Sequence, residues 1–265
     1  MKPNYTYLFL LSPLHTGGTT QEGNLLGIAR EAHTDFPYIP SSSIRGRLRA
    51  SIHQSKDLQS QLFGTDLKDT QDLSQGSIWI GDGALLWVPI SSLSHGVIWV
   101  SCPSLLRRWS KFQGNLQTSI PEEYSTNLST QKAIYLKDAI LKPGSLKEFP
   151  NWSDFIPKDP ATSGITRVIV LPDNHYKTLV QMGLWRQVKV KLDQSKTVDG
   201  GFRYEEAIPP DTLMYYTWGL TSQASQDDTA QEQFLQMLSQ RDIMQIGGQE
   251  SLGRGFVQQW CPPNA

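Results

Sequence analysis

The stretch Phe36–Ile52, FPYIPSSSIRGRLRASI, constrains the fold more than any other part of the chain. Its two prolines favour extended backbone just before them, and the three serines that follow are good N-cap residues for a helix. Ile44, Leu48 and Ile52 recur every four residues. The sequence therefore predicts a helix with one apolar face.

The predicted helix carries cations at the end where the helix dipole favours anions. Arg45 and Arg49 lie four residues apart beside the apolar face, and Ser42 and Ser43 precede them. Free N–H groups, hydroxyls and guanidinium groups together favour a phosphate. The sequence therefore predicts a phosphate site at the start of this helix. The alternative is an amphipathic surface helix whose arginines are simply solvated.

The composition is that of a folded chain with a core, and it lacks the bulk charge of a typical nucleic-acid binder. The chain has 265 residues, of which 38% are hydrophobic and 18% charged, and its formal net charge is −1. Any nucleic-acid site must therefore be a local concentration of cations. Residues 1–54 hold five Lys or Arg against three acids, which is a mild excess.

The cysteines, histidines and apolar runs exclude several classes of protein. Two cysteines and five scattered histidines give no disulfide framework and no zinc-ligand spacing. The N-terminal apolar run Tyr7–Leu11 is too short for a signal peptide, and no stretch is long enough to cross a membrane. We therefore expect a cytoplasmic protein without a membrane partner.

Two glycine-rich segments are candidates for close approach of a ligand to the backbone, because glycine has no Cβ. The first follows a predicted strand, Asn4–Leu11, and matches neither the dinucleotide-binding nor the P-loop pattern. The alternative for it is an exposed hairpin loop. The second leads into a predicted strand, Phe256–Trp260. The candidate residues of the two segments are His15, Gly17, Gly18, Glu22, Asn24, Gly247, Gly248, Gly253 and Arg254.

His15 and two residues that follow the first segment each keep two interpretations. His15 is either a general acid or base or an ordinary loop histidine. Arg30 and Glu31, which follow the first segment, are either part of a site or a structural ion pair.

The stretch Arg186–Ile208 predicts a long β-hairpin with a basic face. Valines and a leucine alternate with Lys189 and Lys191, which indicates a strand with one wet, basic face. The turn DQSKTVDGG places Lys196 and Thr197 at the tip. A hairpin that extends beyond a core indicates a partner to bind, and the alternative is an ordinary edge hairpin.

The remaining elements complete an α+β pattern. The sequence predicts strand, turn and strand over Gly76–Val88, and a polar insertion or loop region over Phe112–Asp159. Further strands and helices are predicted at Gly96–Ser101, Ser104–Lys111, Ile165–Leu171, Asp173–Met182, Thr212–Leu220 and Thr229–Arg241. This order suits a ferredoxin-like β-α-β-β-α-β core enlarged by insertions, in which the first and last strands are neighbours or nearly so.

Several stretches together resemble one family, the RAMP superfamily of CRISPR-associated proteins. IPSSSIRGRLR followed by LFG, and the late IGGQESLGRG, resemble its serine/arginine element and its C-terminal glycine-rich loop. SPLHTGG, VLPDNHY and KTVDGGFRYEEAIPPDTLMYY are similar to the repeating backbone subunit of type III-B (Cmr) effector complexes. The resemblance spans nearly the whole chain, and only residues about 112–160 have little to anchor it.

The resemblance implies a single domain over residues 1–265. Its fold would be a modified ferredoxin-like/RRM palm, residues 1–111 and 160–265, with a protruding thumb hairpin at about 186–208 and an insertion at about 112–160. Copies would form a helical filament along a guide RNA (crRNA), together with other type III subunits. Each thumb would kink the duplex of guide and target RNA. Recognition would be of backbone and shape, while base pairing reads the sequence.

The residues that we predict to contact RNA come from these motifs. They are Gly17, Gly18, Arg30, Ser42, Ser43, Arg45, Arg49, Lys189, Lys196, Thr197, Gly247, Gly248, Gly253 and Arg254.

The resemblance also implies cutting of target RNA, which needs a divalent cation, Mg or Mn, and an acid in the first glycine-rich loop. The family pattern resembles D-L-P-I-x-R-E, and its acid falls here on Asn24 or Leu25. Neither side chain can replace a carboxylate that orients metal or water. The catalytic candidates are therefore Glu22, Asn24 and His15, with Asp35 weaker, and Glu205 and Glu206 match acidic positions at the thumb base. We expect a cation only if the protein cuts, and the metal ligands stay unassigned.

Three rival functions remain open at this point. One is the same backbone subunit without catalysis. Another is a stand-alone, metal-independent RAMP endoribonuclease that processes guide precursors, with His15 and a tyrosine or lysine as acid and base. The third is a generic protein-interaction module, which leaves the glycine loops and the arginines unexplained. The number of chains bound per RNA distinguishes the first two, because only a backbone subunit polymerises.

Overall fold

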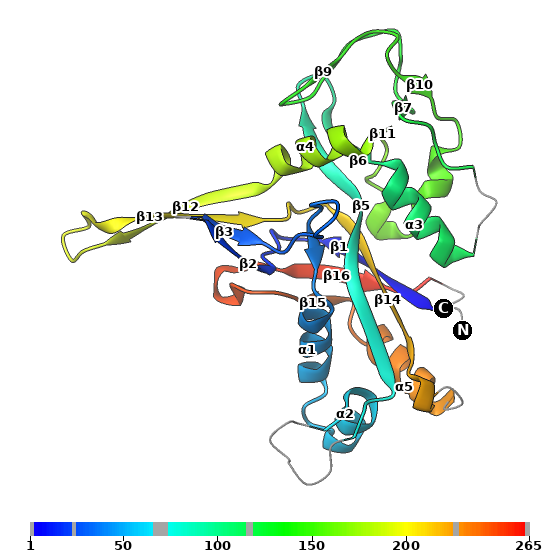
Figure 1. Ribbon diagram of the computed structural model, residues 1–265, viewed down its shortest axis with the longest axis vertical. Helices are drawn as coiled ribbons and strands as arrows, with labels where there is room; N and C mark the ends of the chain where they lie inside the picture. The colour runs from blue at the N-terminus through cyan, green and yellow to red at the C-terminus, as the bar shows by residue number, and fades with distance from the viewer. Residues whose placement is uncertain (1–2, 23–24, 66–73, 115–118, 225–227, 263–265) are drawn as a thin grey trace.

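The computed structural model shows a sheet-based body from which one long hairpin projects (Figure 1). It describes residues 3–22, 25–65, 74–114, 119–224 and 228–262. The first strand begins and the last strand ends on the side of the body away from the hairpin. None of the helices in these ranges is long and apolar enough to cross a membrane.

Four strands at the centre of the main sheet have the order of a ferredoxin-like fold. β1 (Asn4–Leu10) lies between β14 (Leu213–Leu220) and β16 (Phe256–Trp260), and β5 (Ile78–Ser92) lies on the far side of β14. All three neighbouring pairs are antiparallel, so β1 and β5 are parallel with β14 between them. This arrangement confirms the predicted α+β class and the neighbouring first and last strands.

Short strands extend the main sheet at both edges. β15 (Ile243–Gln245) pairs with β16, and this strand was not predicted. At the other edge the order continues from β5 through β6 (Gly96–Ser101), β11 (Val168–Val170), β7 (Ser125–Thr126) and β10 (Lys147–Glu148). β4 (Tyr38–Ile39) also pairs with β5, and β8 (Ile134–Tyr135) forms a separate hairpin with β9 (Ile140–Leu141).

Helices cover both faces of the main sheet, because its central strands carry large apolar side chains on both. One core contains Leu8 and Leu10 of β1 with residues of α1 (Ser41–Ser51) and α5 (Asp228–Ser239). The other contains Tyr7 of β1, packed with residues of α3 (Pro103–Gln113). A fully buried leucine contributes about 1.5–3 kcal/mol to stability. The two remaining helices are α2 (Lys56–Phe63) and α4 (Asp173–Gly183).

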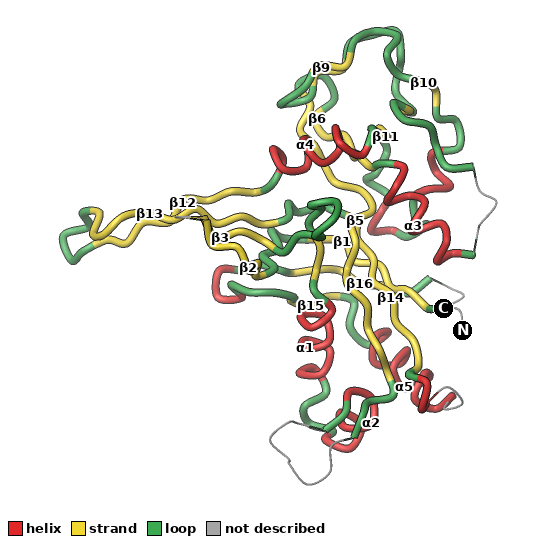
Figure 2. The backbone as a smooth tube through the Cα atoms, viewed as in Figure 1, coloured by secondary structure: helices red, strands yellow, loops and turns green. Residues whose placement is uncertain are grey.

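The projecting hairpin is the predicted one, and we call residues 185–207 the thumb. β12 (Trp185–Leu192) pairs antiparallel with β13 (Val198–Ala207). At the base of the thumb β13 pairs in parallel with β3 (Leu25–Ile28), which pairs with β2 (Gly17–Glu22). The first glycine-rich segment is therefore partly a strand pair, and this second sheet anchors the thumb to the body (Figure 2).

The predicted turn within Gly76–Val88 is wrong, because β5 runs through it as one strand. The two glycines that suggested a turn lie where neighbouring residues come close. A Cβ on Gly81 would be 2.5 Å from Oγ1 of Thr217, and a Cβ on Gly83 would be 3.0 Å from Cβ of Ile39. Glycine is needed at these positions for close packing within the sheet.

The segment 119–165 is mostly loop (Figure 2). It nevertheless packs on the sheet, because Phe149 and Phe155 are buried in the same core as Tyr7. Trp87 of β5 donates a hydrogen bond from Nε1 to the carbonyl of Phe155, at 2.9 Å. This segment therefore covers the face of the main sheet that α3 also covers.

Candidate nucleic-acid interface

The outer half of the thumb exposes apolar side chains on one face. Val188 pairs with Tyr204 and Val190 with Phe202 across the hairpin. These four side chains are between 42 and 49% exposed, and the rings of Phe202 and Tyr204 meet edge to face with centroids 5.5 Å apart. Exposed apolar side chains on a projecting element are typical of a binding surface, and aromatic rings stack on nucleobases.

The opposite face of the thumb is basic, as the alternation predicts. Lys189 pairs with Arg203 across the hairpin, and Lys191 forms an ion pair with Asp199 at 2.9 Å. At the tip, Asp193 accepts hydrogen bonds from the N–H and the hydroxyl of Thr197, and these lower the pKa of Asp193. Thr197 therefore stabilises the turn, while the side chains around it are exposed.

At the base of the thumb a buried carboxylate holds three cations. Glu205 is fully buried, and its oxygens lie 2.8 Å from Lys189, 2.9 Å from Arg203 and 3.2 Å from Arg254. Burial raises the pKa of Glu205, but the hydrogen bonds and charges around it, foremost those of Lys189, bring it below its ordinary value. Lys189, predicted to contact RNA, is thus paired within the protein.

Arg254 connects the second glycine-rich segment to the thumb instead of facing solvent. It is 4% exposed, and it donates to Gln187 at 2.7 Å and also to Gln249. Its guanidinium lies 4.3 Å from the ring centroid of Trp185. A guanidinium with these partners stabilises the thumb base, so the predicted RNA contact of Arg254 is not supported by its position.

The next residue, Glu206, holds cations on the other face of β13, because successive residues of a strand point to opposite faces. Its carboxylate accepts hydrogen bonds from Arg30 at 3.0 Å and from Nε of Arg186 at 3.0 Å. Its carbonyl oxygen lies 2.7 Å from Nδ1 of His15, which is 5% exposed. His15 is a buried structural residue here and is not placed to exchange protons with a substrate.

The charges at the thumb base do not cancel. Lys189, Arg203 and Arg254 around Glu205, together with Arg30 and Arg186 around Glu206, make five cations against two carboxylates. The excess of positive charge lies where the thumb meets the body, and it favours a polyanion there.

The helix α1 begins after Pro40, so the prediction that a serine caps it is wrong. Ser42 and Ser43 lie in its first turn. The N–H of Ser41 donates to the carboxylate of Asp82 on β5, at 2.7 Å. An acidic side chain of the protein therefore already occupies the position that the helix dipole favours for an anion.

Arg45 is directed at the protein. It donates hydrogen bonds to the carbonyls of Phe63 and Ile78, the latter at 3.2 Å, and lies 5.5 Å from the ring centroid of Phe63. Burial, and next the charge of Arg49, lower the pKa of Arg45. Arg45 thus joins α1 to α2 and β5, which does not support its predicted phosphate contact, whereas the role of Arg49 stays a prediction.

Some glycines of the two glycine-rich segments serve the packing of the chain on itself. A Cβ on Gly18 would be 2.8 Å from the carbonyl oxygen of Ile28, and one on Gly247 (φ 83°) would be 2.4 Å from that of His15. The N–H of Gly248 donates to the same His15 carbonyl at 3.0 Å. Gly17 and Gly253 have open space around them, so these two remain candidates for contact with a ligand.

A cavity of about 600 Å³ lies between the thumb base, the β2–β3 pair and the start of α1. Three carboxylates line it, and a cation holds each of them. Glu206 is paired as described, Glu31 is paired with Arg108, and Asp35 lies 3.3 Å from Lys177. The described part of the chain contains no group of three His, Cys, Asp or Glu placed to hold a metal ion.

The residues predicted to serve catalysis do not form a metal site in the described part of the chain. Asn24 lies outside the described residues, and the backbone of Glu22 forms the end of β2 opposite Leu25 without a described side chain. The described carboxylates near the β2–β3 pair are all paired with cations, so they do not fit a divalent cation.

Sequence reasoning missed several residues of the thumb base. Arg186 and Arg203 contact the two buried carboxylates, while Gln187 accepts a hydrogen bond from Arg254 and Trp185 packs under its guanidinium. The signal for them was present in the alternation of the hairpin, which places Gln187 opposite Glu205 once the register is known.

Comparison with known proteins adds three findings. The model of the RAMP superfamily matches residues 8–258. The CRISPR system Cmr endoribonuclease Cmr4 of Pyrococcus furiosus is 27% identical over 281 residues, which cover 97% of this chain and 95% of that protein. Two solved structures share the fold. A chain of a type III-B Cmr-beta complex bound to cognate target RNA has a TM-score of 0.77 at 18% identity, with 97% of this chain and 96% of that chain covered. Oligomeric Cmr4 from Pyrococcus furiosus has a TM-score of 0.73 at 24% identity, with 98% and 97% covered.

Proposed function

This chain belongs to the RAMP superfamily, and from that premise we propose that it is the guide-RNA-binding backbone subunit of a type III-B CRISPR effector complex. Its partners are the guide crRNA, the target RNA, further copies of itself in a helical filament and other type III subunits. It acts in the cytoplasm in antiviral defence. The similarity to the Cmr endoribonuclease Cmr4 extends over nearly the full length of both chains, which supports this assignment.

The observation that carries the proposal is the two-faced thumb. Phe202 and Tyr204 are exposed on a projecting strand pair, on the face opposite Lys189, Lys191 and Arg203. In the proposed complex the aromatic face enters the guide–target duplex and stacks on bases, while the more exposed cations Arg186, Lys191 and Arg203 contact phosphates. Stacking on bases and contacts to phosphates do not depend on the base sequence, which suits a subunit that repeats along any guide.

Target cutting is the part of the family resemblance that these residues support least. The acid it needs falls on Asn24 or Leu25, and the described carboxylates nearby are neutralised by cations. Glu22 is the one acidic residue in the segment 17–28. We therefore propose the backbone role as the function, and we derive no cleavage step.

The stoichiometry of the complex tests the backbone role. The purified chain is mixed with guides of increasing length, and the mass of each complex is measured by native mass spectrometry. A backbone subunit adds one copy for each fixed increment of guide. One or two copies on every guide, with release of a shortened RNA, would instead indicate the stand-alone endoribonuclease. The burial of His15 argues against that rival.

Cleavage is tested separately on the assembled guide complex. A labelled complementary RNA is added with Mg²⁺, with Mn²⁺ and with EDTA. Tight binding without cuts is the expected result. Evenly spaced, metal-dependent cuts that Glu22→Ala abolishes while assembly persists would assign catalysis to Glu22.

A further inference from the structure

The face of the main sheet opposite α1 and α5 carries aromatic side chains on its two central strands. Tyr5 and Tyr7 of β1 and Tyr215 of β14 belong to the core on that face. In RNA-recognition domains with a four-stranded sheet of this kind, aromatic side chains of the sheet stack on bases. This chain has aromatic rings at that face, and a ligand can bind there only if some of the rings are accessible.

Most of these rings are covered. Trp109 of α3 donates from Nε1 to the hydroxyl of Tyr7 at 3.0 Å, and Phe112 packs edge to face on Tyr215 with centroids 6.1 Å apart. Burial raises the pKa of Tyr7 far above its ordinary range, so its hydroxyl stays neutral. The middle of the face is therefore closed by the protein's own residues.

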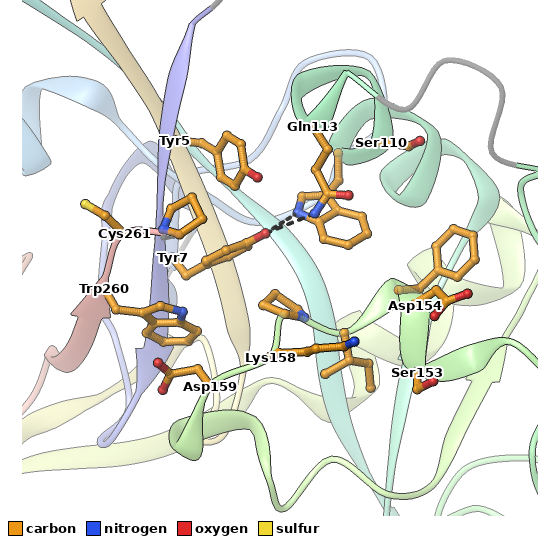
Figure 3. A pocket seen from close by; sticks show the side chains of 15 residues that line it. Tyr5, Tyr7, Ser110, Gln113, Ser153, Asp154, Lys158, Asp159, Trp260 and Cys261 are labelled. Atoms are coloured by element: carbon orange, nitrogen blue, oxygen red, sulfur yellow. Dashed lines mark hydrogen bonds between the residues drawn. The ribbon is translucent and has the colours of Figure 1, made fainter. Parts of the chain in front are cut away.

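One end of the face remains hollow. A cavity of about 590 Å³ lies between β1, the end of β16, α3 and residues 153–159 (Figure 3). This volume is within the range of about 300–1,000 Å³ that small-molecule sites occupy. Tyr5 and Trp260 form its aromatic wall; both are only half-buried, and Trp260 lies 5.3 Å from Tyr7 between ring centroids.

The polar groups around this cavity include one cation and two carboxylates, and they suit the parts of a nucleotide. Lys158 is exposed, extends across the cavity in Figure 3, and forms no ion pair with any residue that the structure describes. The carboxylate of Asp159 also lines the cavity, and its Oδ1 accepts a hydrogen bond from the N–H of Ala161 at 2.9 Å. A lysine is a common phosphate ligand, and a carboxylate accepts a hydrogen bond from an amino group such as N4 of cytosine.

We propose that this cavity binds a nucleotide. The base stacks on Tyr5 and Trp260, the phosphate lies at Lys158, and Asp159 favours bases that carry an exocyclic amino group. The site is distinct from the thumb, because β1 begins and β16 ends on the side of the body away from it (Figure 1). The inference does not rest on the proposed function, since it uses none of the thumb's residues.

The experiment measures binding to the full chain by equilibrium dialysis. The probes are cytidine 5′-monophosphate, uridine 5′-monophosphate, cytidine and hexacytidylate. The variants are Trp260→Leu, Tyr5→Leu and Lys158→Gln. Phe256→Leu, on the same strand and 39% exposed, is the matched aromatic control, and Lys142→Gln is the lysine control. Thermal unfolding of each variant confirms that it is folded.

We expect cytidine 5′-monophosphate to bind, and Trp260→Leu and Tyr5→Leu to weaken it about tenfold each, as loss of base stacking does. Lys158→Gln weakens the monophosphate and leaves cytidine unchanged, and the two controls change nothing. Uridine 5′-monophosphate binds more weakly than its cytidine counterpart, and equal affinities would contradict the role of Asp159.

The nucleotide in this site could belong to an RNA strand or be free in solution, and hexacytidylate distinguishes these two sources. Hexacytidylate that binds more tightly than the monophosphate, with a loss in Trp260→Leu, assigns the site to RNA, whereas a tighter monophosphate assigns it to free nucleotides. The proposal is overturned if neither probe binds, or if neither Trp260→Leu nor Tyr5→Leu weakens the binding of either probe. Thumb variants should leave this binding unchanged, so failure of the nucleotide-site proposal and failure of the proposed function are separate results.

Discussion

The base and the outer half of the thumb belong to the same two strands but are stabilised in opposite ways. At the base, Glu205 and Glu206 are 0 and 2% exposed and are surrounded by cations of β12, β13, the segment after β3 and the loop before β16. In the outer half, Phe202 and Tyr204 are nearly half exposed, and their rings contact each other beside the equally exposed Val188 and Val190. At the base the buried carboxylates have their partners within the chain, whereas the apolar side chains of the outer half are covered only when a partner binds.

This difference separates residues that fold the thumb from residues that use it. A change at the base should alter stability first and RNA binding as a consequence. A change in the outer half should alter RNA binding and leave stability nearly unchanged. The predictions below test that separation, beginning with the largest expected effect.

Glu205→Ala should lower the free energy of unfolding by about 3–5 kcal/mol, because it leaves the buried guanidinium of Arg254 without its counter-charge. Urea unfolding measures the change. Asp199→Ala is the matched control, since it removes an acid from an exposed ion pair with Lys191 and should cost less than about 1 kcal/mol. Equal effects of the two substitutions would contradict the comparison.

Phe202→Ala and Tyr204→Ala should each weaken RNA binding by about 1–3 kcal/mol, because base stacking is lost. Their free energies of unfolding should change by less than about 0.5 kcal/mol, as at most surface sites. Filter binding and urea unfolding measure the two quantities. Tyr135→Ala, an exposed tyrosine 45% accessible on β8, is the control and should change neither. A large loss of stability in the thumb variants would show that the protein itself needs these rings.

Arg45 and Arg49 extend the comparison to α1. Arg45→Ala should lower the free energy of unfolding by about 1–3 kcal/mol, because the carbonyls of Phe63 and Ile78 lose their donor. Arg49→Ala should instead reduce the salt dependence of RNA binding by about one unit of slope. Titrations at several salt concentrations measure this. If Arg45→Ala also reduces the slope while its stability is unchanged, Arg45 binds phosphate after all.

The smallest effect is a pH dependence at the base. The pKa of Glu205 is lower in the folded protein than its ordinary value, so its stabilising contribution is complete above that value and is lost as the pH falls. The stability difference between the wild type and Glu205→Gln should therefore shrink below about pH 4.3. Thermal unfolding across this range measures it. A difference that stays constant down to acid pH would show that the charge of Glu205 is not what stabilises the base.

The sequence predicted the elements whose patterns are local. Alternation marked the thumb, and the apolar stripe of Ile44 and Leu48 marked α1, which buries both residues. The turn predicted near Gly81 failed because the packing of Thr217 against that glycine is a contact between distant residues. The site was predicted less well for the same reason. A sequence shows that Arg45 and Arg254 are cations, but it does not show that carbonyls and buried carboxylates elsewhere in the chain hold them.

The position of β1 has a consequence for how this protein is made. β1 is central in the sheet, and its neighbours are β14 and β16, so Leu10 pairs with Val257. A ribosome that adds about 5–20 residues per second needs roughly 10–50 s to travel between these two positions. For most of that time, until β14 has been synthesised, the apolar side chains of the first strand have no partner strand. The sheet therefore closes only after the last strand has emerged.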